Sequence, residues 1–392
     1  MDGHDRHGRF SAAAPDEARL VNEARFMDAA LALAARGLGR TSPNPAVGCV
    51  IVRNGEIVGR GWHRGPGSPH AEAMALADAG AEARGAVAYV TLEPCNHHGR
   101  TGPCAQALID AGVRGVVYAI PDPNRIAAGG ARRLAVHGLG VREGVRADEA
   151  RDLNRAWLHA VSTGRAYVHA KSAMSLDGRI ATGAGESRWI TGAEARARGH
   201  AYRRDADAIL VGADTVVAAD PALTHRGAAS GDADRPQPLR VVVDSRARVS
   251  PGAKVFERTG RGALLACLAD VPARRLAAFE ELGVDVVRLP KGPDGRPDLR
   301  DLTAAVWRRG AARLLVEGGG RLIGALRDAD LIDELSVFIA PKIIGGGRPG
   351  FDGAGVARLA DASRFEFAPP EPLGADVLFH GRRRRDDATE VR

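Results

Sequence analysis

One short stretch of the sequence, from His70 to Cys104, limits what the chain can fold into more than any other. Glu72 follows His70 closely, and Cys95 and Cys104 come later with eight residues between them. A catalytic zinc ion takes three nitrogen or sulfur ligands from the protein and leaves a fourth position to water, whose pKa it lowers to about 7. The set predicts zinc bound by His70, Cys95 and Cys104, with Glu72 as general base and acid. A fold with this site must bring three separate segments to one point.

The pattern is typical of zinc-dependent nucleobase deaminases, although its cysteines lie farther apart than in the short form of that signature. Two alternatives stay open at this point. In the first, His97 or His98, which stand in the cysteine loop, competes with His70 as a ligand. In the second, the histidine is an ordinary helix residue and the cysteines are buried packing, the usual place of an isolated free cysteine. Cys49 and Cys267 fall in apolar runs and are expected in the core.

Composition narrows the class of protein. A length of 392 residues predicts about two domains, and four cysteines are too few for a secreted fold held by disulfides. No segment approaches the run of about 18 apolar residues that a membrane helix needs, and the N-terminus lacks an apolar leader. We therefore expect a cytoplasmic enzyme without a membrane partner. The net charge of +7 comes almost wholly from arginine and aromatic residues make up only 4% of the chain, which argues against a nucleic-acid partner.

The first half of the chain alternates between helix and strand patterns. A loose extension is expected over residues 1–18, and a first domain over 19–162. Helices are expected at 23–36, 70–79, 104–111 and 148–161, and strands at 47–52, 56–62, 87–91 and 113–120, the first two strands forming a hairpin. Such alternation predicts a layered α/β sandwich in which loops at one edge of the sheet carry the chemistry.

A Ser-Thr-Gly boundary at 162–164 precedes a second domain, expected over 166–380, and a charged tail, expected over 381–392. Strands are expected at 167–174, 208–211, 240–243, 263–268, 284–289 and 313–316, with helices between several of them. Glu317 and three glycines then open a helical segment, where bare N–H groups can approach a phosphate. Glycines also end strands for geometric reasons, so this signal alone is weak. The usual dinucleotide fingerprint is absent, so a nicotinamide cofactor would need a different α/β fold.

Two sets of short motifs stand in order along the chain. The first half contains TSPNP at 41–45 and the segments 61–63, 70–72, 93–95 and 100–104. The second half contains Lys171, SLDGR at 175–179, segment 185–191, Thr215, DPALT at 220–224, Arg226 and segment 317–319. With these motifs, both halves resemble the bifunctional riboflavin-biosynthesis deaminase/reductase family, over nearly the whole chain after about residue 22. The resemblance implies a cytidine-deaminase-like α/β/α sandwich followed by a dihydrofolate-reductase-like α/β domain.

The resemblance implies two successive reactions on a phosphorylated pyrimidine. The first is zinc-dependent hydrolytic deamination of 2,5-diamino-6-(5-phosphoribosylamino)pyrimidin-4(3H)-one, and the second is NADPH-dependent reduction of the ribosyl group to give 5-amino-6-(5-phosphoribitylamino)uracil. By motif position, the residues expected to bind substrate are Asn44, Lys171, Asp177, Ser187, Arg203, Leu223, Arg226 and Glu317. Those expected to bind NADPH are Ala173, Trp189, Thr215, Ser245, Gly319, Gly320, Arg321, Leu322, Ile323, Gly324 and Ala325. The arginines suit a phosphate ester, since a guanidinium group matches its geometry.

The sequence departs from the family at a few positions. Ala219 stands where an aspartate or asparagine commonly precedes Asp220, so we expect NADPH to lose one hydrogen bond, worth about 0.5–1.5 kcal/mol. The alternative function is a nucleic-acid or free-nucleobase zinc deaminase with an accessory C-terminal binding domain. A nucleic-acid deaminase should show an aromatic and basic groove. The resemblance also implies a homo-oligomer.

Overall fold

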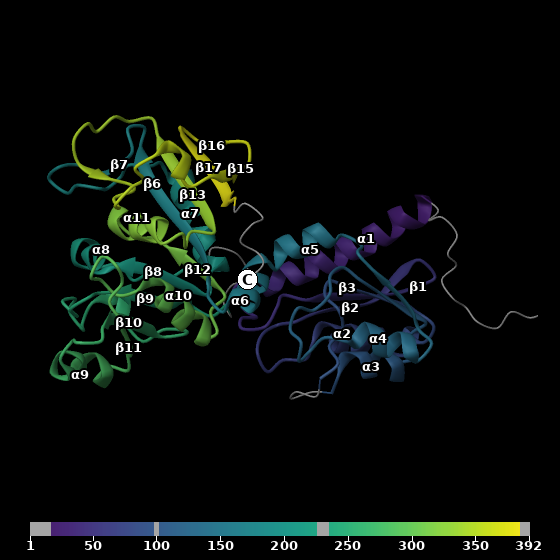
Figure 1. Ribbon diagram of the computed structural model, residues 1–392. Helices are drawn as coiled ribbons and strands as arrows, with labels where there is room; N and C mark the ends of the chain where they lie inside the picture. The colour runs from purple at the N-terminus through teal and green to yellow at the C-terminus, as the bar shows by residue number, and fades with distance from the viewer. Residues whose placement is uncertain (1–16, 98–101, 226–234, 385–392) are drawn as a thin grey trace, which may run out of the picture. The chain divides into compact units, whose positions relative to one another are not determined.

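The computed structural model of the protein describes residues 17–97, 102–225 and 235–384 (Figure 1). The chain divides into two compact units, Met1–Ser162 and Thr163–Arg392. Each unit combines strands with helices, so the expected α/β class is confirmed. In the described ranges, no helix combines the length and the apolar character needed to cross a bilayer.

Unit 1 is built on a sheet with the strand order β2-β1-β3-β4-β5. The strands are β1 (Gly48–Arg53), β2 (Glu56–Trp62), β3 (Val87–Val90), β4 (Gly115–Tyr118) and β5 (Gly140–Glu143). The helices are α1 (Glu17–Ala34), α2 (Ala71–Ala79), α3 (Cys104–Asp110), α4 (Gly130–Val136), α5 (Ala147–Leu153) and α6 (Arg155–Thr163). β1 and β2 form the expected antiparallel hairpin, while β3, β4 and β5 are parallel. α1 and α5 lie on one face of the sheet and α2, α3 and α4 on the other, as expected for an α/β/α sandwich (Figure 1).

Glycines in the hairpin let helices approach the sheet closely from both sides. A Cβ atom on Gly48 of β1 would lie 2.0 Å from the carbonyl oxygen of Ala30 in α1. A Cβ atom on Gly61 of β2 would lie 2.1 Å from the carbonyl oxygen of Ala71 in α2. Both distances are far below van der Waals contact, so any larger residue would push the layers apart. This close packing fixes the start of α2 against the sheet.

The single helix expected over 148–161 is wrong, because the structure has two helices with Asn154 between them. The Asn154 amide accepts a hydrogen bond from the Ala46 N–H and donates one to the Ala46 carbonyl, each at 2.9 Å. The side chain is buried, where a polar group must be hydrogen-bonded. The helical ladder thus breaks at a residue that anchors the loop carrying Asn44. The helix α4 and the strand β5 were also not expected.

Unit 2 is built on a larger sheet with the order β11-β10-β9-β8-β12-β6-β13-β17-β15, and β16 also pairs with β17. Its strands are β6 (Tyr167–Ser175), β8 (Ala208–Gly212), β9 (Leu239–Val243), β10 (Ala263–Leu268), β11 (Asp285–Leu289), β12 (Arg313–Val316), β13 (Glu334–Ala340), β15 (Phe365–Phe367), β16 (Glu371–Leu373) and β17 (Asp376–Arg383). A separate pair joins β7 (Arg179–Ala181) and β14 (Arg348–Pro349). The helices are α7 (Ala193–Asp205), α8 (Ala213–Ala219), α9 (Ala273–Glu281), α10 (Leu299–Arg308) and α11 (Gly320–Asp328).

Successive strand residues in unit 2 enter two different hydrophobic cores. Leu210 belongs to one core cluster, whereas Ile209 and Val211 belong to the other. The strands from β11 to β13 are parallel, and parallel sheets are covered on both faces. This explains why β8, β9 and β10 read as nearly continuous apolar runs in the sequence.

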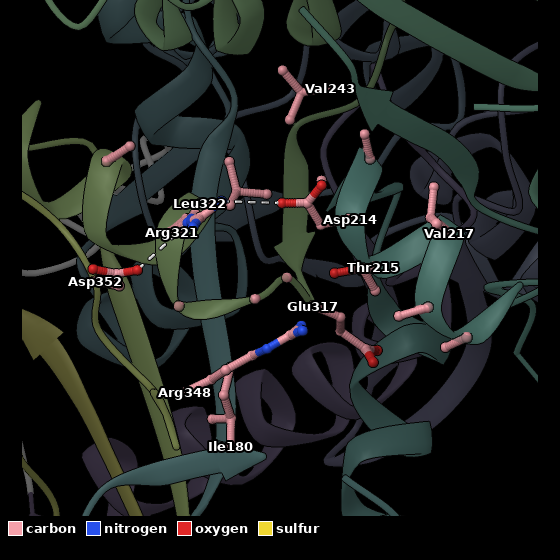
Figure 2. A pocket seen from close by; sticks show the side chains of 18 of the residues that line it. Ile180, Asp214, Thr215, Val217, Val243, Glu317, Arg321, Leu322, Arg348 and Asp352 are labelled. Carbon is pink, nitrogen blue, oxygen red and sulfur yellow. Dashed lines mark ion pairs between the residues drawn. The ribbon is translucent and has the colours of Figure 1, made fainter. Parts of the chain in front are cut away.

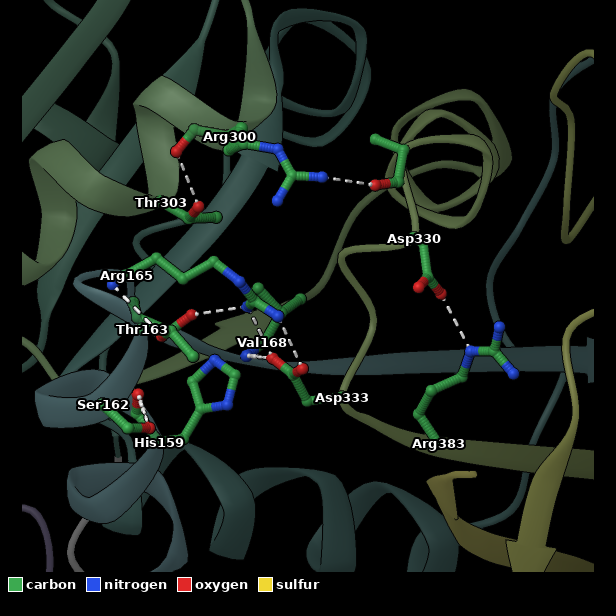
Figure 3. A network of polar contacts seen from close by, with 12 residues as sticks. His159, Ser162, Thr163, Arg165, Val168, Arg300, Thr303, Asp330, Asp333 and Arg383 are labelled. Atoms are coloured by element: carbon green, nitrogen blue, oxygen red, sulfur yellow. Dashed lines mark hydrogen bonds and ion pairs between the residues drawn. The ribbon is translucent and has the colours of Figure 1, made fainter. Parts of the chain in front are cut away.

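A buried ion pair fastens the first strand of unit 2. The Arg165 guanidinium donates two hydrogen bonds of 2.8 Å to the Asp333 carboxylate, which also accepts one from the Val168 N–H (Figure 3). Both charged side chains are almost fully buried, and the bidentate geometry satisfies the carboxylate in place of water. The pair ties the start of β6 to the residue just before β13.

The charged tail expected over 381–392 is wrong for its first residues, because Gly381–Arg383 are the last part of β17. β17 pairs with both β13 and β15 through this end, and the Arg383 side chain lies 2.9 Å from the Asp330 carboxylate. Arginines fit here because alternate side chains of a strand face opposite sides. Residues 385–392 lie outside the described part of the chain. The expected N-terminal extension of 1–18 also lies outside it, except that α1 already begins at Glu17.

Candidate active sites

Three segments of unit 1 meet at one histidine and two cysteines. His70 immediately precedes α2, Cys95 lies in the loop after β3, and Cys104 is the first residue of α3. His70 Nδ1 lies 3.2 Å from Cys104 Sγ and 3.6 Å from Cys95 Sγ, and the Cys104 N–H donates to Cys95 Sγ at 3.4 Å. The three donor atoms lie within 4.8 Å of one another. The structure thus brings together the three residues expected to hold zinc.

The other two histidines of the cysteine loop do not enter this cluster in the same way. His97 lines the same cavity but is not part of the group of converging donor atoms, and His98 lies outside the described residues. Each of the four cysteines is free, so no disulfide competes for the thiols. The donor set therefore fits a zinc ion with one nitrogen and two sulfur ligands from the protein.

The electrostatics of the cluster favour a thiolate beside a protonatable carboxylate. A hydrogen bond from Cys104, together with others from the His70 ring and the Cys104 backbone, lowers the pKa of Cys95 to about 4. The shared proton then stays on Cys104, whose pKa is raised by its bond to Cys95 and by burial. Burial, aided by the charge of Cys95, raises the pKa of Glu72 to about 7. Thiolate is the form that binds metal, so the site is electrostatically prepared for a cation.

A cavity of about 200 Å³ adjoins the cluster and also receives Glu72. Asn44, the residue expected to bind the pyrimidine, lines it, and its Nδ2 atom lies 3.0 Å from His63 Nε2. His63 Nδ1 in turn lies 3.2 Å from the carbonyl oxygen of Pro69, next to the zinc cluster. Burial lowers the pKa of His63, so the imidazole is neutral near neutral pH. His63 therefore fixes the orientation of the Asn44 amide.

No role was predicted for four residues of this cavity, His63, Asp122, Asn124 and Trp157. Burial raises the pKa of Asp122, whose carboxylate accepts a 2.8 Å hydrogen bond from the Asn124 N–H. His63 belongs to the segment 61–63 that resembles the family, but nothing local in the sequence marks Asp122, Asn124 or Trp157 as neighbours of the zinc ligands.

Unit 2 has a much larger cavity, of about 810 Å³, beyond the carboxyl ends of its parallel strands (Figure 2). β8, β9 and β12 contribute residues at or just after their ends, which is where ligands bind in open α/β sheets, and β6 contributes residues from its second half. The expected site residues that line it are Lys171, Ala173, Ser187, Thr215, Ser245, Glu317, Gly319, Gly320, Arg321, Leu322 and Ala325. Its volume lies in the upper part of the range of about 300–1,000 Å³ that is usual for ligand-binding pockets.

Glu317 is held between two cations at the end of β12. The Arg203 guanidinium donates to it through Nε at 2.6 Å and Nη2 at 2.9 Å, and Lys171 Nζ lies 3.9 Å away. Burial alone would raise the pKa of Glu317, but the charges of Lys171 and Arg203 outweigh it and lower the pKa to about 2. Arg203 also donates to the Thr224 carbonyl at 3.2 Å. One α7 arginine thus joins the end of β12 to the loop after α8.

Other expected site residues do not line the large cavity. They are Asp177, Trp189, Arg203, Leu223, Ile323 and Gly324, while Arg226 lies outside the described residues. The Asp177 carboxylate accepts hydrogen bonds from the N–H groups of Ile344 and Gly345. Trp189 is 64% exposed, and the Arg196 guanidinium lies 4.6 Å from the centre of its ring. Leu223 and Ile323 are buried in the cores.

The glycines that open α11 have different surroundings. A Cβ atom on Gly320 would lie 2.1 Å from the carbonyl oxygen of Pro349, and one on Gly324 would lie 2.4 Å from the backbone of Asp352. A Cβ atom on Gly319 would meet only Thr215 Oγ1, at 3.9 Å. Gly320 and Gly324 are thus required for packing, whereas Gly319 keeps the floor of the cavity open.

Comparisons with known proteins agree with both sites. Residues 21–120 match the model of the cytidine and deoxycytidylate deaminase zinc-binding region, and residues 166–379 match that of the RibD C-terminal domain. The chain is 42% identical to the riboflavin biosynthesis protein RibD of Escherichia coli (strain K12) over 367 residues, covering 91% of this chain and 98% of that protein. The chain belongs to the RibD family.

Solved structures of the family extend this likeness to three dimensions. Acinetobacter baumannii RibD superposes with a TM-score of 0.85 at 38% identity, covering 93% of this chain and all of that one. A diaminohydroxyphosphoribosylaminopyrimidine deaminase/5-amino-6-(5-phosphoribosylamino)uracil reductase from Thermotoga maritima superposes with a TM-score of 0.81 at 31% identity, covering 93% of this chain and 99% of that one. The expected cytidine-deaminase-like and dihydrofolate-reductase-like units are thereby confirmed.

As a RibD protein, the chain is a bifunctional enzyme of riboflavin biosynthesis, with a zinc-dependent deaminase and an NADPH-dependent reductase. Its substrates are small molecules. This decides against the alternative of a nucleic-acid or free-nucleobase deaminase with an accessory binding domain, because the second unit is the RibD reductase domain.

Proposed function

We propose that unit 1 deaminates 2,5-diamino-6-(5-phosphoribosylamino)pyrimidin-4(3H)-one and that unit 2 reduces the product to 5-amino-6-(5-phosphoribitylamino)uracil. The observation that carries the first step is the convergence of His70, Cys95 and Cys104 at the cavity that holds Glu72. The second step is supported by the large cavity at the ends of the parallel strands of unit 2. The Thermotoga maritima relative is named for both activities.

In the deaminase, His70, Cys95 and Cys104 would hold the zinc ion. Bound zinc supplies a water molecule that is acidic at neutral pH. Glu72 lies in the first turn of α2, two residues from His70, and its carboxylate reaches the same cavity. It takes a proton from the attacking water and gives one to the departing amino nitrogen, which leaves as ammonia. Asn44, oriented by His63, holds the pyrimidine ring over this carboxylate.

In the reductase, Lys171, Ser187 and Glu317 line the cavity and would contact the phosphorylated substrate, with Arg203 acting through Glu317. NADPH supplies the hydride. Asp177 and Leu223 are proposed as substrate contacts from outside the cavity lining, and Arg226, also proposed as a contact, lies outside the described residues. A charged cluster at one end suits a phosphorylated sugar, since cations held in place attract the ester and orient it.

The cofactor segment would be the start of α11 and the strand ends around it. Gly319 is the N-cap of α11, so its neighbouring N–H groups are free to face an anion, and Thr215 lies across from it. Ala173, Ser245, Arg321, Leu322 and Ala325 complete this part of the lining, and Trp189, Ile323 and Gly324 are proposed as cofactor neighbours from outside it. Stacked or aliphatic contacts would hold the nicotinamide end, and polar contacts the phosphates.

A paired assay of ammonia release and NADPH oxidation tests both assignments. We expect E72Q to lose ammonia release by a factor of about 10²–10⁴, the contribution of a positioned general base, while still reducing the deaminated uracil and keeping its zinc. E82Q serves as the matched control, because Glu82 is an exposed carboxylate of the same unit, paired with Arg53. Equal ammonia release by E72Q and E82Q would refute the role of Glu72, and ammonia without any NADPH oxidation in the wild type would refute the second step.

We further propose that the chain forms a homo-oligomer in the cytoplasm. Phe367 and Phe379 are exposed on β15 and β17, with ring centres 6.5 Å apart, and exposed aromatic pairs of this kind favour protein contacts. The free thiols suit a reducing compartment. Light scattering should give a mass above that of the monomer for the wild type and a lower mass for F379S; equal masses would contradict the proposed interface.

A further inference from the structure

Glu93 is a buried carboxylate in the loop between β3 and α3 of unit 1. One of its oxygens, Oε1, accepts hydrogen bonds from the N–H groups of Gly129 and Ala131, at 3.1 and 3.0 Å. The other, Oε2, accepts a hydrogen bond from the Asp122 N–H at 3.3 Å. A single side chain thus holds both ends of the segment 122–131 against the loop that carries the first cysteine ligand.

Other contacts fasten the same segment to the cysteine loop. The Asn96 N–H donates to the Ala127 carbonyl at 2.8 Å, and the Arg133 guanidinium of α4 donates to Asn96 Oδ1 at 3.1 Å. A Cβ atom on Gly130 would lie 1.7 Å from the Pro94 carbonyl oxygen, so the two stretches of backbone touch with no room for a side chain. These contacts fix the segment from residue 127 onward, whereas the carboxylate also reaches its first residue.

The segment that Glu93 holds forms one wall of the deaminase cavity. Asp122, Asn124 and Ala127 line this cavity beside the zinc ligands. The Asp122 carboxylate accepts a 2.8 Å hydrogen bond from the Asn124 N–H, so the position of Asp122 also sets that of Asn124. Glu93 lines the cavity too, but both of its oxygens accept backbone hydrogen bonds. We therefore expect Asp122 and Asn124 to supply the polar contacts with a ligand from this wall.

A carboxylate suits this position because backbone N–H groups replace the water that burial removes. Hydrogen bonds to an ionised acceptor are stronger than those between neutral groups. If one acceptor oxygen were replaced, a buried N–H group would be left without its partner, which costs more than the net worth of the bond. The position of Asp122 therefore depends on the second oxygen of Glu93.

We propose that Glu93 is a positioning residue of the deaminase, which acts through Asp122 on the binding of the pyrimidine. Its Oε1 atom fixes the start of α4 and its Oε2 atom fixes Asp122, so the cavity wall is held in place before the substrate arrives. A preformed wall strengthens binding because less conformational freedom is lost when the ligand binds. The inference rests on the deamination that we propose for unit 1.

The variant E93Q separates the two arms of the carboxylate. The glutamine carbonyl can keep the hydrogen bonds from Gly129 and Ala131, but the amide group then brings an N–H donor against the Asp122 N–H. In an ammonia-release assay of the zinc-loaded full chain with the diaminopyrimidine substrate, we expect KM to rise by about five- to tenfold, within the range for one hydrogen bond. The kcat and the zinc content should stay close to those of the wild type, as for a loss of binding alone.

The matched control is D78N, which should leave KM unchanged. The exposed Asp78 carboxylate also accepts a backbone hydrogen bond, from the Arg60 N–H at 2.8 Å, but it does not line the cavity. Adding E93Q to D122N shows whether Glu93 acts through Asp122. We expect E93Q to change kcat/KM by less than about twofold in that background, because residues that act through one another are not additive. Calorimetric titration with the substrate supplies the Kd where turnover is too slow to measure.

Zinc content, circular dichroism and reduction of the deaminated uracil report the folding of each variant. E93D is a second test if E93Q loses zinc, since its shorter side chain cannot reach Asp122 and Gly129 together and its KM should also rise. The inference is overturned if the folded, zinc-loaded variants have the KM of D78N, or if E93Q has the same effect with D122N as without it. A wild type that releases no ammonia would overturn the proposed deamination and this inference with it.

Discussion

Replacing Glu317 with glutamine tests the charge balance of the reductase site most directly. The Glu317 carboxylate is almost fully buried and neutralises Arg203, at 2.6 and 2.9 Å, and Lys171, at 3.9 Å. Its pKa is lowered from 4.5 to about 2, because the attraction of the two cations outweighs the cost of burial. The difference corresponds to about 3 kcal/mol of unfolding free energy at neutral pH. E317Q should lose a similar amount, since it leaves two largely buried cations without their counter-charge.

The destabilisation of E317Q should depend on pH, in a direction set by the lowered pKa of Glu317. A carboxylate with a lowered pKa stabilises the folded state fully above its unfolded value of 4.5, and this stabilisation disappears as the pH falls toward 2. The deficit of E317Q relative to wild type should therefore be constant above about pH 5 and shrink below it. Urea unfolding, followed by hydrogen exchange of peptides from β12, measures the free energy for unit 2 alone.

D214N is the matched control for E317Q. Asp214 also lies between two arginines, Arg248 at 3.2 Å and Arg321 at 3.5 Å, but all three side chains are more than half exposed. Exposed ion pairs contribute about 0–1 kcal/mol, so D214N should change the unfolding free energy little. If E317Q and D214N have equal effects, or if the E317Q deficit is unchanged at pH 3, the balance of burial and charge derived for Glu317 is wrong.

Two further substitutions separate packing from cofactor binding. G320A should destabilise unit 2 by about 1–3 kcal/mol, because its Cβ would overlap the Pro349 carbonyl. G319A should leave the unfolding temperature unchanged and raise the Kd for NADPH by about tenfold. Calorimetry measures the first effect and fluorescence titration the second, and equal unfolding temperatures for the two variants would contradict the geometry. Ala219 lines the large cavity, so A219D should add one hydrogen bond to NADPH and tighten NADPH binding by about 2- to 12-fold. Unchanged or weaker binding in the same titration would show that the aspartate does not reach the cofactor.

The zinc centre could be predicted because zinc binding depends mainly on the types of side chain present, which the sequence shows directly. Few side chains bind zinc, and the order His70, Glu72, Cys95 and Cys104 supplies ligands and a proton carrier together. The structure added the contact that the sequence does not reveal, between Asn154 and the backbone of Ala46. Those residues are separated by 108 positions, and the helical pattern of 148–161 continues through Asn154 without a break in its spacing.

The C-terminal strands were missed for a related reason. β13 and β17 are antiparallel to each other, and their pairing places Glu334 opposite Arg382 and Ser336 opposite His380. Polar and charged residues therefore occupy strand positions that a hydrophobic pattern does not mark. The run of arginines from 382 onward indicated a solvated tail, but its first two residues belong to β17. The backbone of β17 is paired with a strand on each side, and this pairing does not depend on which side chains face outward.

The segment from Gly319 to Ala325 shows what a family resemblance carries over and what the fold adds. The resemblance implies that the whole segment binds NADPH, but α11 begins within it, and a helix turns successive residues in different directions. Gly319, Arg321, Leu322 and Ala325 line the cavity, while Ile323 packs into the core and Gly324 meets the backbone of Asp352. Gly320 does both, because its backbone lines the cavity and its missing side chain lets Pro349 approach. Within one continuous motif, some residues are therefore required by the cofactor and others by the packing that holds the helix in place.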